Sequence, residues 1–352
     1  MDGILIIDKP AGLTSHDVVA RVRRILKTRR VGHTGTLDPF ATGVMVILAG
    51  QATRLAQFLD KDEKEYEALV RFGFETDTGD VTGSPKSKVQ GPKSLSLEDV
   101  RAVLGDFRGE IEQTPPMYSA KKIDGKKLYE LARKGETVVR KPVRVNISNL
   151  EAGNGNPNDG NSGLSAGTAG TLACKAGSSG LTDPVVDQLA TEQNANAHQA
   201  GGTGVNSFTG EGACVTGDTV TLRVTCSAGT YIRTLAEDIA RRAGTLAHLE
   251  ELRRIRAGRF TIAQSLTLEQ LAELPEPASA LIPMEQAVAH LPGLELTDER
   301  IAKTRNGLST RVRDANFVDG EAVKMADSGG RLVAVGRYDA EENIVQPKVV
   351  LV

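Results

Sequence analysis

A carboxylate in a glycine-rich loop is the first candidate for chemistry. Residues 32–43 read GHTGTLDPFATG and place Asp38 between Leu37 and Pro39. The proline biases the residue before it toward extended backbone, and the apolar neighbours favour a partly desolvated carboxylate. No acidic residue follows before Asp60, so a lone carboxylate nucleophile is a simpler hypothesis than a local acid and base pair of the glycosidase kind. Composition alone favours the plainer alternative, an aspartate that forms a turn.

A second group of candidates lies in residues 227–234, SAGTYIRT, where a predicted strand meets a predicted helix. Tyr231 and Arg233 are two positions apart, so on extended backbone they would face the same side. The ring could stack on a base, and the guanidinium could hold a carboxylate with two hydrogen bonds. The plainer alternative is a tyrosine that fills the core and an arginine on the surface.

Basic residues gather in two other segments. Residues 21–30 contain arginine and lysine but no acid, and residues 115–134 interleave basic residues with Tyr118 and Tyr129. A solvated helix face explains the first segment as well as a ridge that contacts phosphates does. The interleaving of the second is typical of contacts with single-stranded or loop RNA. Tyr66 opens another predicted strand directly after a charged run.

Composition limits the classes of protein. The chain has 352 residues, enough for two domains, and its 39% hydrophobic and 25% charged residues are a globular composition. Three cysteines and five histidines form neither a disulfide framework nor a metal-ligand pattern. No signal peptide or membrane-spanning run is predicted, so we expect a cytoplasmic protein without membrane association. The net charge of −2 conceals basic segments at 1–150 and 218–270 beside acidic ones at 151–217 and 271–352.

Periodicity indicates the elements that must position these residues. Alternating or apolar runs predict strands, and capped amphipathic segments predict helices. The predicted strands are residues 3–8, 66–74 and 219–227, and the predicted helices are residues 14–26, 96–107 and 233–243. Helices and strands without strict alternation favour an α+β fold, with a small β-rich domain at 285–352. Residues 153–215 are rich in glycine and asparagine, which predicts a flexible, dispensable insertion.

Five motifs occur in one order along the chain. They are DKPAGLTSHD from residue 8, GHTGTLDPFATG from residue 32, DTGD from residue 77, PPMYSAKKIDGKKLYELARKG from residue 115 and GTYIRTLAEDI from residue 229. This combination resembles the TruB family, the bacterial tRNA pseudouridine-55 synthases, over about 1–150 and 216–275. The resemblance implies an enzyme that flips a uridine out of the T loop of tRNA and isomerises it to pseudouridine.

The resemblance also implies an architecture and a set of partners. We expect a pseudouridine synthase fold, with a mixed or antiparallel central sheet and flanking helices, followed by a small PUA-like β domain. The expected catalytic domain is 1–280, with a thumb-like segment at about 115–141 and the insertion at about 153–215, and the PUA-like domain is 285–352. The implied enzyme uses no cofactor and no metal. It is a monomer that binds the T stem-loop without a guide RNA or an obligate protein partner.

Site residues follow from the same resemblance, position by position. Asp38 is the implied nucleophile, which attacks the uridine or its ribose. Arg233 is expected to pair with Asp38 and keep it ionised, and Tyr231 is a candidate for proton removal at C5. The implied substrate-binding side chains have separate roles. Tyr66 stacks on the flipped uracil, Tyr231 contacts the ribose or base, and Leu252 lines the same pocket. His33 occupies the space that the nucleotide leaves in the RNA loop.

Two alternatives remain open at this point. One is a guide-dependent or ribosomal-RNA pseudouridine synthase of the same fold, against which the thumb-like segment and the lack of a long basic tail argue. The other is an RNA chaperone that assists tRNA folding without chemistry. The intact set of Asp38, Tyr66, Tyr231 and Arg233 argues against a purely non-catalytic protein, but it is compatible with both roles in one chain.

Overall fold

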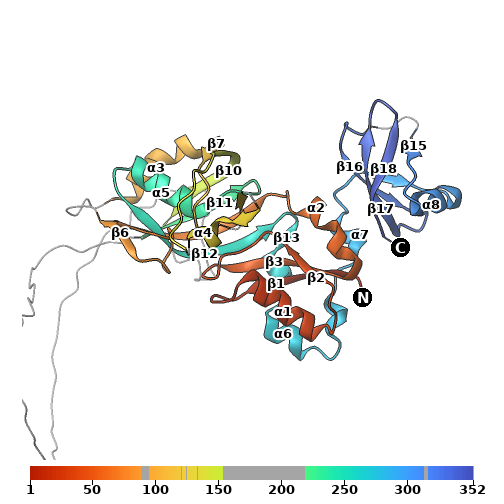
Figure 1. The fold of residues 1–352 in the computed structure, drawn as a ribbon, viewed down its shortest axis with the longest axis horizontal. Helices are drawn as coiled ribbons and strands as arrows, with labels where there is room; N and C mark the ends of the chain where they lie inside the picture. The colour runs from red at the N-terminus through yellow and green to blue at the C-terminus, as the bar shows by residue number, and fades with distance from the viewer. Residues whose placement is uncertain are drawn as a thin grey trace, which may run out of the picture. The chain divides into compact units, whose positions relative to one another are not determined.

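The computed structural model describes residues 1–88, 95–119, 121–123, 125–132, 134–153, 219–312 and 316–351 (Figure 1). The predicted insertion at about 153–215 lies outside these residues, apart from Gly153 at the end of a strand. The predicted thumb-like segment at about 115–141 is described except at positions 120, 124 and 133. Within the described residues, no helix has the length and apolar character needed to cross a membrane.

The larger sheet has nine strands within the described residues. Seven follow one another in the order β1 (Gly3–Lys9), β3 (Thr42–Ala49), β12 (Ala247–Ala257), β4 (Lys64–Phe72), β11 (Thr219–Cys226), β10 (Val143–Gly153) and β7 (Gly109–Gln113). Off this path, β2 (Val31–Thr34) pairs with β3, and β13 (Phe260–Thr261) pairs with β12. Neighbouring strands are antiparallel except for β12 and β3, which run parallel, so the predicted mixed central sheet is confirmed.

Two groups of helices pack on different parts of this sheet, as Figure 1 shows. Helices α3 (Leu97–Val103) and α5 (Ile232–Arg242) pack on the β4, β10 and β11 part, where the apolar positions of β11 point inward. Helices α1 (Ser15–Ile25) and α6 (Leu268–Glu273) pack on β1 and β3 through a separate apolar cluster. The short helices are α2 (Ala56–Leu59), α4 (Leu128–Ala132) and α7 (Met284–Ala287), and 3-10 turns occupy Gly50–Leu55, Leu104–Phe107, Ile262–Gln264 and Pro277–Ala280.

Helix α1 forms where the sequence predicts it. Thr14 is the N-cap, and its side chain and that of Asp17 close a reciprocal capping box. Val18, Val19 and Val22 are buried, whereas the basic residues on the opposite arc are exposed. The amphipathic pattern therefore fixes which face of α1 meets the sheet and leaves its basic face in water.

The C-terminal part is a second, five-stranded sheet within the described residues. Its order is β14 (Gly293–Glu295), β16 (Ala322–Ala326), β17 (Leu332–Asp339), β18 (Ile344–Val350) and β15 (Thr310–Arg311), with helix α8 (Asp298–Arg305) beside it. Val323, Met325, Val333 and Val345 lie in its own apolar cluster. The predicted α+β fold with a small C-terminal β-rich, PUA-like part is confirmed.

Some element boundaries differ from the prediction for identifiable reasons. The strand expected at 66–74 begins at Lys64 and stops at Phe72, because Gly73 takes a φ of 105° and separates β4 from β5 (Phe74–Thr76). β5 pairs with β6 (Pro85–Lys88) in a separate hairpin, and β8 (Lys122–Ile123) pairs with β9 (Lys126–Lys127) in another. The helix expected at 96–107 ends as an α-helix at Val103 and continues as a 3-10 turn.

Candidate active site

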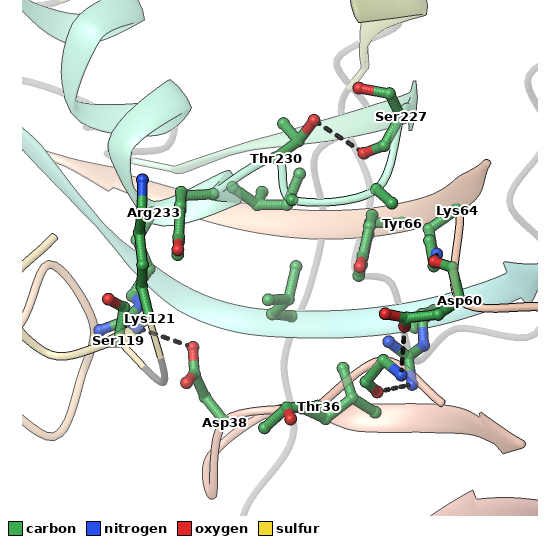
Figure 2. Close-up of a pocket in the computed structure, with 18 residues that line it drawn as sticks. Thr36, Asp38, Asp60, Lys64, Tyr66, Ser119, Lys121, Ser227, Thr230 and Arg233 are labelled. Carbon is green, nitrogen blue, oxygen red and sulfur yellow. Dashed lines mark hydrogen bonds and ion pairs between the residues drawn. The ribbon is translucent and has the colours of Figure 1, made fainter. Parts of the chain in front are cut away.

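A cavity of about 250 Å³ opens where the Asp38 loop faces β4, β12 and the start of α5. Figure 2 shows Asp38 rising from its loop toward Arg233, with Tyr66 pointing into the same space. Five of the predicted site residues line this cavity: Asp38, Tyr66, Tyr231, Arg233 and Leu252. They come from three parts of the sequence, and Tyr66 and Leu252 are brought together because β4 and β12 are neighbours.

His33 is the predicted site residue that lines a different cavity. That cavity, of about 320 Å³, adjoins the first and shares Gly35, Thr36 and Asp60 with it. The ring of His33 lies edge-on to His16, with 5.9 Å between the centroids. Burial lowers the pKa of His33, and the nearby His16 and Arg254 lower it further, so the imidazole is held neutral.

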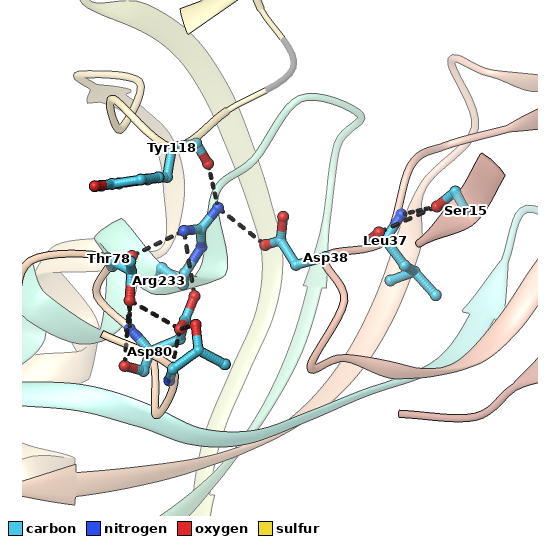
Figure 3. A network of polar contacts seen from close by, with 8 residues as sticks. Ser15, Leu37, Asp38, Thr78, Asp80, Tyr118 and Arg233 are labelled. Carbon is cyan, nitrogen blue, oxygen red and sulfur yellow. Dashed lines mark hydrogen bonds and ion pairs between the residues drawn. The ribbon is translucent and has the colours of Figure 1, made fainter. Parts of the chain in front are cut away.

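The Asp38 loop is tied to helix α1 through the residue before the carboxylate. The Ser15 hydroxyl donates to the Leu37 carbonyl at 3.1 Å, and the Leu37 amide donates to the same hydroxyl oxygen at 2.9 Å (Figure 3). Leu37 is itself 4% exposed and belongs to the main core cluster. The position of Asp38 is therefore set by packing and by hydrogen bonds on its N-terminal side.

A buried lysine holds the C-terminal side of the same loop. Lys9, at the end of β1, is fully buried, and its Nζ donates to the carbonyls of Pro39 at 3.2 Å and Ala41 at 2.6 Å. Burial lowers the pKa of Lys9 to about 8, although the negative charge of Asp38 acts in the opposite direction. The two carbonyls and the lysine fix the turn that follows the carboxylate.

Arg233 joins two carboxylates at the edge of the cavity. Its Nη2 lies 2.9 Å from Asp38 Oδ2, and its Nη1 lies 3.3 Å from Asp80 Oδ2 (Figure 3). The same guanidinium donates to the carbonyls of Thr78 at 2.8 Å and Tyr118 at 2.7 Å. With its side chain 6% exposed, Arg233 is a buried and fully engaged cation that holds Asp38 in one orientation.

The cavity shifts the acidity of the groups that face it. Burial raises the pKa of the Asp38 carboxyl even though 34% of the side chain reaches water, and Asp80 adds to the rise while Arg233 opposes it. Burial also raises the pKa of the Tyr231 and Tyr66 phenols. An arginine shared by two carboxylates stabilises each one less than a dedicated partner would. Arg233 therefore fixes the position of the Asp38 carboxylate without abolishing the rise in its pKa.

Comparisons with known proteins decide what this cavity belongs to. Residues 23–171 match the TruB family pseudouridylate synthase (N terminal domain), and residues 233–289 match the tRNA pseudouridylate synthase B C-terminal domain. Over the full length of both chains, the protein is 37% identical to the tRNA pseudouridine synthase B of Solibacter usitatus. The corresponding protein of Bacillus pumilus is 34% identical over all of this chain and 98% of its own.

The chain belongs to the TruB family. It is therefore a pseudouridine synthase, an isomerase. A solved structure described as a Cbf5-Nop10-Gar1 complex aligns with a TM-score of 0.64 at 25% identity, covering 99% of this chain and 84% of that one. A structure of an H/ACA RNP bound to a substrate RNA containing 2'-deoxyuridine aligns with a TM-score of 0.63 and supports the fold.

Several residues in or beside this TruB-family cavity were not predicted from the sequence. Asp80 was noticed only as part of the DTGD motif, and its link to Arg233 joins residues 153 positions apart. Lys64 lines the cavity and donates to the carbonyls of Asp60 and Asp62, the latter at 2.6 Å. Arg254 is 1% exposed and also borders the cavity. Lys64 lies just before the strand predicted at 66–74, within a charged run, so no local signal distinguished it from a solvated lysine.

The described residues also bear on metal binding in this TruB-family chain. No group of three or more His, Cys, Asp or Glu side chains in the described ranges could hold a metal ion. The acids near the cavity are instead engaged by Arg233 or by backbone amides, as when Asp60 Oδ1 accepts from the Gly35 amide at 3.0 Å.

Proposed function

We propose that this TruB-family enzyme isomerises uridine 55 in the T loop of tRNA to pseudouridine, with Asp38 as the nucleophile. The observation that carries the proposal is the ion pair of Asp38 and Arg233 at a cavity that Tyr66 and Tyr231 also line. The curated relatives are named tRNA pseudouridine synthase B, which supports tRNA as the substrate. The motifs from residues 8 to 239 support the T-loop uridine.

The reaction requires the uracil to leave its stack and enter a closed site. Tyr66 is suited to stack on the flipped ring, and Leu252 forms an apolar part of the wall. His33, which is neutral and borders the adjoining cavity, is suited to occupy the place that the flipped nucleotide leaves in the loop. Stacking on Tyr66 and burial of the base offset the free energy of unstacking, which is on the order of a few kcal/mol.

The chemical step exchanges one glycosidic bond for another. The N1–C1′ bond breaks, the detached uracil turns within the cavity, and a C5–C1′ bond forms. One proton leaves C5 and one is added at N1, and the Asp38 carboxylate is released unchanged at the end. An ionised Asp38 supplies the attacking carboxylate, and Arg233 holds that carboxylate in place through the 2.9 Å contact. Tyr231 lines the same cavity and is our candidate to take the C5 proton as the phenolate, although burial raises its pKa and disfavours that form.

Binding of the tRNA is proposed to read RNA shape and phosphates. The exposed basic face of α1 and the basic thumb-like segment at about 115–141 supply positive charge. We propose domains at 1–280 and 285–352, with the second as an accessory PUA-like domain. We also propose that the enzyme acts in the cytoplasm as a monomer without a guide RNA, and that it assists tRNA folding.

The neighbouring solved structures raise an alternative that the experiment must exclude, an enzyme that works only with a guide RNA or partner proteins. Their descriptions name Nop10, Gar1 and an H/ACA RNP, so relatives of this fold work in assemblies with protein or RNA. The present chain is 37% identical over its full length to a tRNA pseudouridine synthase B, against 25% for the Cbf5 complex. This difference favours a stand-alone tRNA enzyme.

Tritium release tests the proposal directly. Unmodified tRNA labelled at C5 of uridine is incubated with the purified protein alone, and we expect one equivalent of label per tRNA. Asp38→Asn should abolish release while tRNA affinity stays within about tenfold, and Asp327→Asn, which alters an exposed turn, should behave like the wild type. A tRNA with cytidine at position 55 should release nothing. Release from that RNA, or a requirement for added RNA or protein, would contradict the proposal.

A further inference from the structure

Arg254 is a buried cation on β12 that differs from the other arginines of its strand. Arg253 lies 2.8 Å from a carboxylate oxygen of Asp8, and Arg256 lies 3.0 Å from one of Glu65. Arg254 is 1% exposed, and within the described residues no carboxylate lies within ion-pair distance of it. A guanidinium buried without a counter-ion costs free energy, so its hydrogen bonds must do something that an apolar residue would not.

Those hydrogen bonds reach both sides of the Asp38 loop. The Nε of Arg254 donates to the Val44 carbonyl at 2.7 Å, at the start of β3, and its Nη2 donates to the Gly35 carbonyl at 2.9 Å. Gly35 precedes Asp38 and Val44 follows it, so one side chain spans the loop. The planar fork of arginine can hold two carbonyls at fixed positions, which a lysine ammonium cannot do as rigidly.

The two glycines that flank the loop are explained by the same residue. Gly35 has a φ of +66°, and a Cβ placed on it would lie 3.1 Å from Arg254 Nη1. Gly43 has a φ of +99°, and a Cβ there would collide with the backbone of Arg254, which pairs with Gly43 in the parallel ladder. The loop is therefore packed against Arg254 at both ends, by the side chain at one and by the backbone at the other.

Arg254 also contacts Tyr66, on the neighbouring strand β4. The nearby guanidinium acts against burial, which raises the pKa of the Tyr66 phenol. Tyr66 is the direct partner of Arg254 in the β12–β4 ladder. Through these contacts one buried side chain fixes the Asp38 loop and the Tyr66 ring relative to each other.

We propose that Arg254 is a positioning residue for pseudouridine synthesis, which sets the distance between the Asp38 carboxylate and the flipped uracil by holding Gly35, Val44 and Tyr66. Its effect passes through these residues. The inference rests on the proposed function only in that uridine isomerisation is the reaction measured. It does not depend on which uridine of the tRNA is modified.

The test separates chemistry from binding and from folding. Arg254→Met and Arg254→Lys are compared with Arg256→Met, a matched arginine on the same strand whose partners are Glu65 and the Gly258 carbonyl. With enzyme in excess over C5-labelled tRNA, we expect the single-turnover rate to fall about a hundredfold in both Arg254 variants, while tRNA affinity changes by less than about threefold. Arg256→Met should retain the wild-type rate. Since methionine could fail to fold, the lysine variant, which keeps the charge, is sufficient for the test.

A double-mutant cycle with Tyr66→Phe gives a readout that a purely structural role would not move. If Arg254 acts partly through the Tyr66 hydroxyl, the rate losses of Arg254→Lys and Tyr66→Phe should be less than additive by about threefold or more. Hydrogen exchange of the peptide that covers residues 35–44 should quicken in Arg254→Lys. A folded Arg254→Lys with a rate within threefold of the wild type, or fully additive losses with unchanged exchange, would overturn the proposal. A wild-type protein that releases no tritium would instead refute the proposed function.

Discussion

Replacing Ser15 by alanine should uncouple the Asp38 loop from helix α1. The hydroxyl is 2% exposed and serves Leu37 twice, as donor to its carbonyl and as acceptor from its amide. Alanine removes both bonds. The immediate result is a buried peptide donor and a buried peptide acceptor without partners, one residue before Asp38.

The size of the effect follows from those two orphaned groups. Each buried polar group without a partner costs about 1–3 kcal/mol, and because the loop can relax toward solvent on the Asp38 side, we expect the lower half of the sum, about 2–4 kcal/mol of unfolding free energy. Relaxation also moves the carboxylate away from Arg233, whose Nη2 now lies 2.9 Å from it. A displacement of the order of 1 Å lowers the rate of an oriented reaction by up to about a hundredfold, so we expect a loss of about tenfold to a hundredfold.

The assay pairs urea unfolding with single-turnover tritium release at a temperature where the variant remains folded. Ser279→Ala is the matched control, because its exposed hydroxyl bonds only to the Glu276 carbonyl at 2.7 Å, and it should change stability by less than about 0.5 kcal/mol. If Ser15→Ala unfolds like the wild type and turns over at the same rate, the loop is not anchored through Leu37. A loss of stability with full activity would show that the anchor serves the core and not the carboxylate.

Three further outcomes are expected. Gly43→Ala should lower the free energy of unfolding by about 2–4 kcal/mol, because its Cβ would meet the β12 backbone at a positive φ. Gly12→Ala is the control: its φ is +85° but nothing lies within 4 Å of the new Cβ, so it should cost only about 1 kcal/mol. Equal losses in urea unfolding would contradict this prediction. Burial raises the pKa of the Cys226 thiol to about 11, so with the other two cysteines replaced by serine, iodoacetamide at pH 8 should label the protein only after it unfolds. Because the pKa of Asp38 is raised, the single-turnover rate should begin to fall, as the pH is lowered, at a pH above the usual carboxyl range. Asp80→Asn removes a negative charge that repels the Asp38 carboxylate, so it should move this acid limb of the pH profile to lower pH. An acid limb that does not move, or that moves to higher pH, would refute the assignment of the limb to Asp38.

The residues that line the cavity could be predicted from the sequence more fully than the elements and side chains that hold them in place. Asp38 and Arg233 lie in motifs dense enough to be recognised, and local periodicity placed helix α1 and strand β11 closely. The order of strands could not be predicted, because nothing local indicates that β12 inserts between β3 and β4 and runs parallel to one of them. Arg254 was missed for the same reason, since its partners Val44 and Gly35 lie 210 and 219 positions away.

The position of β12 in the sheet determines when the cavity can form during translation. Asp38 and Tyr66 are made early in synthesis, but the strand that lies between β3 and β4 and carries Leu252 and Arg254 is among the last parts of the larger sheet to be made. Before that strand leaves the ribosome, β3 and β4 each lack a hydrogen-bonding neighbour and the cavity lacks a wall. A nascent chain therefore cannot modify RNA, and a cut between β10 and β11 would divide the cavity between two pieces that are each inactive alone. Recovery of activity on mixing the two pieces would then measure their association.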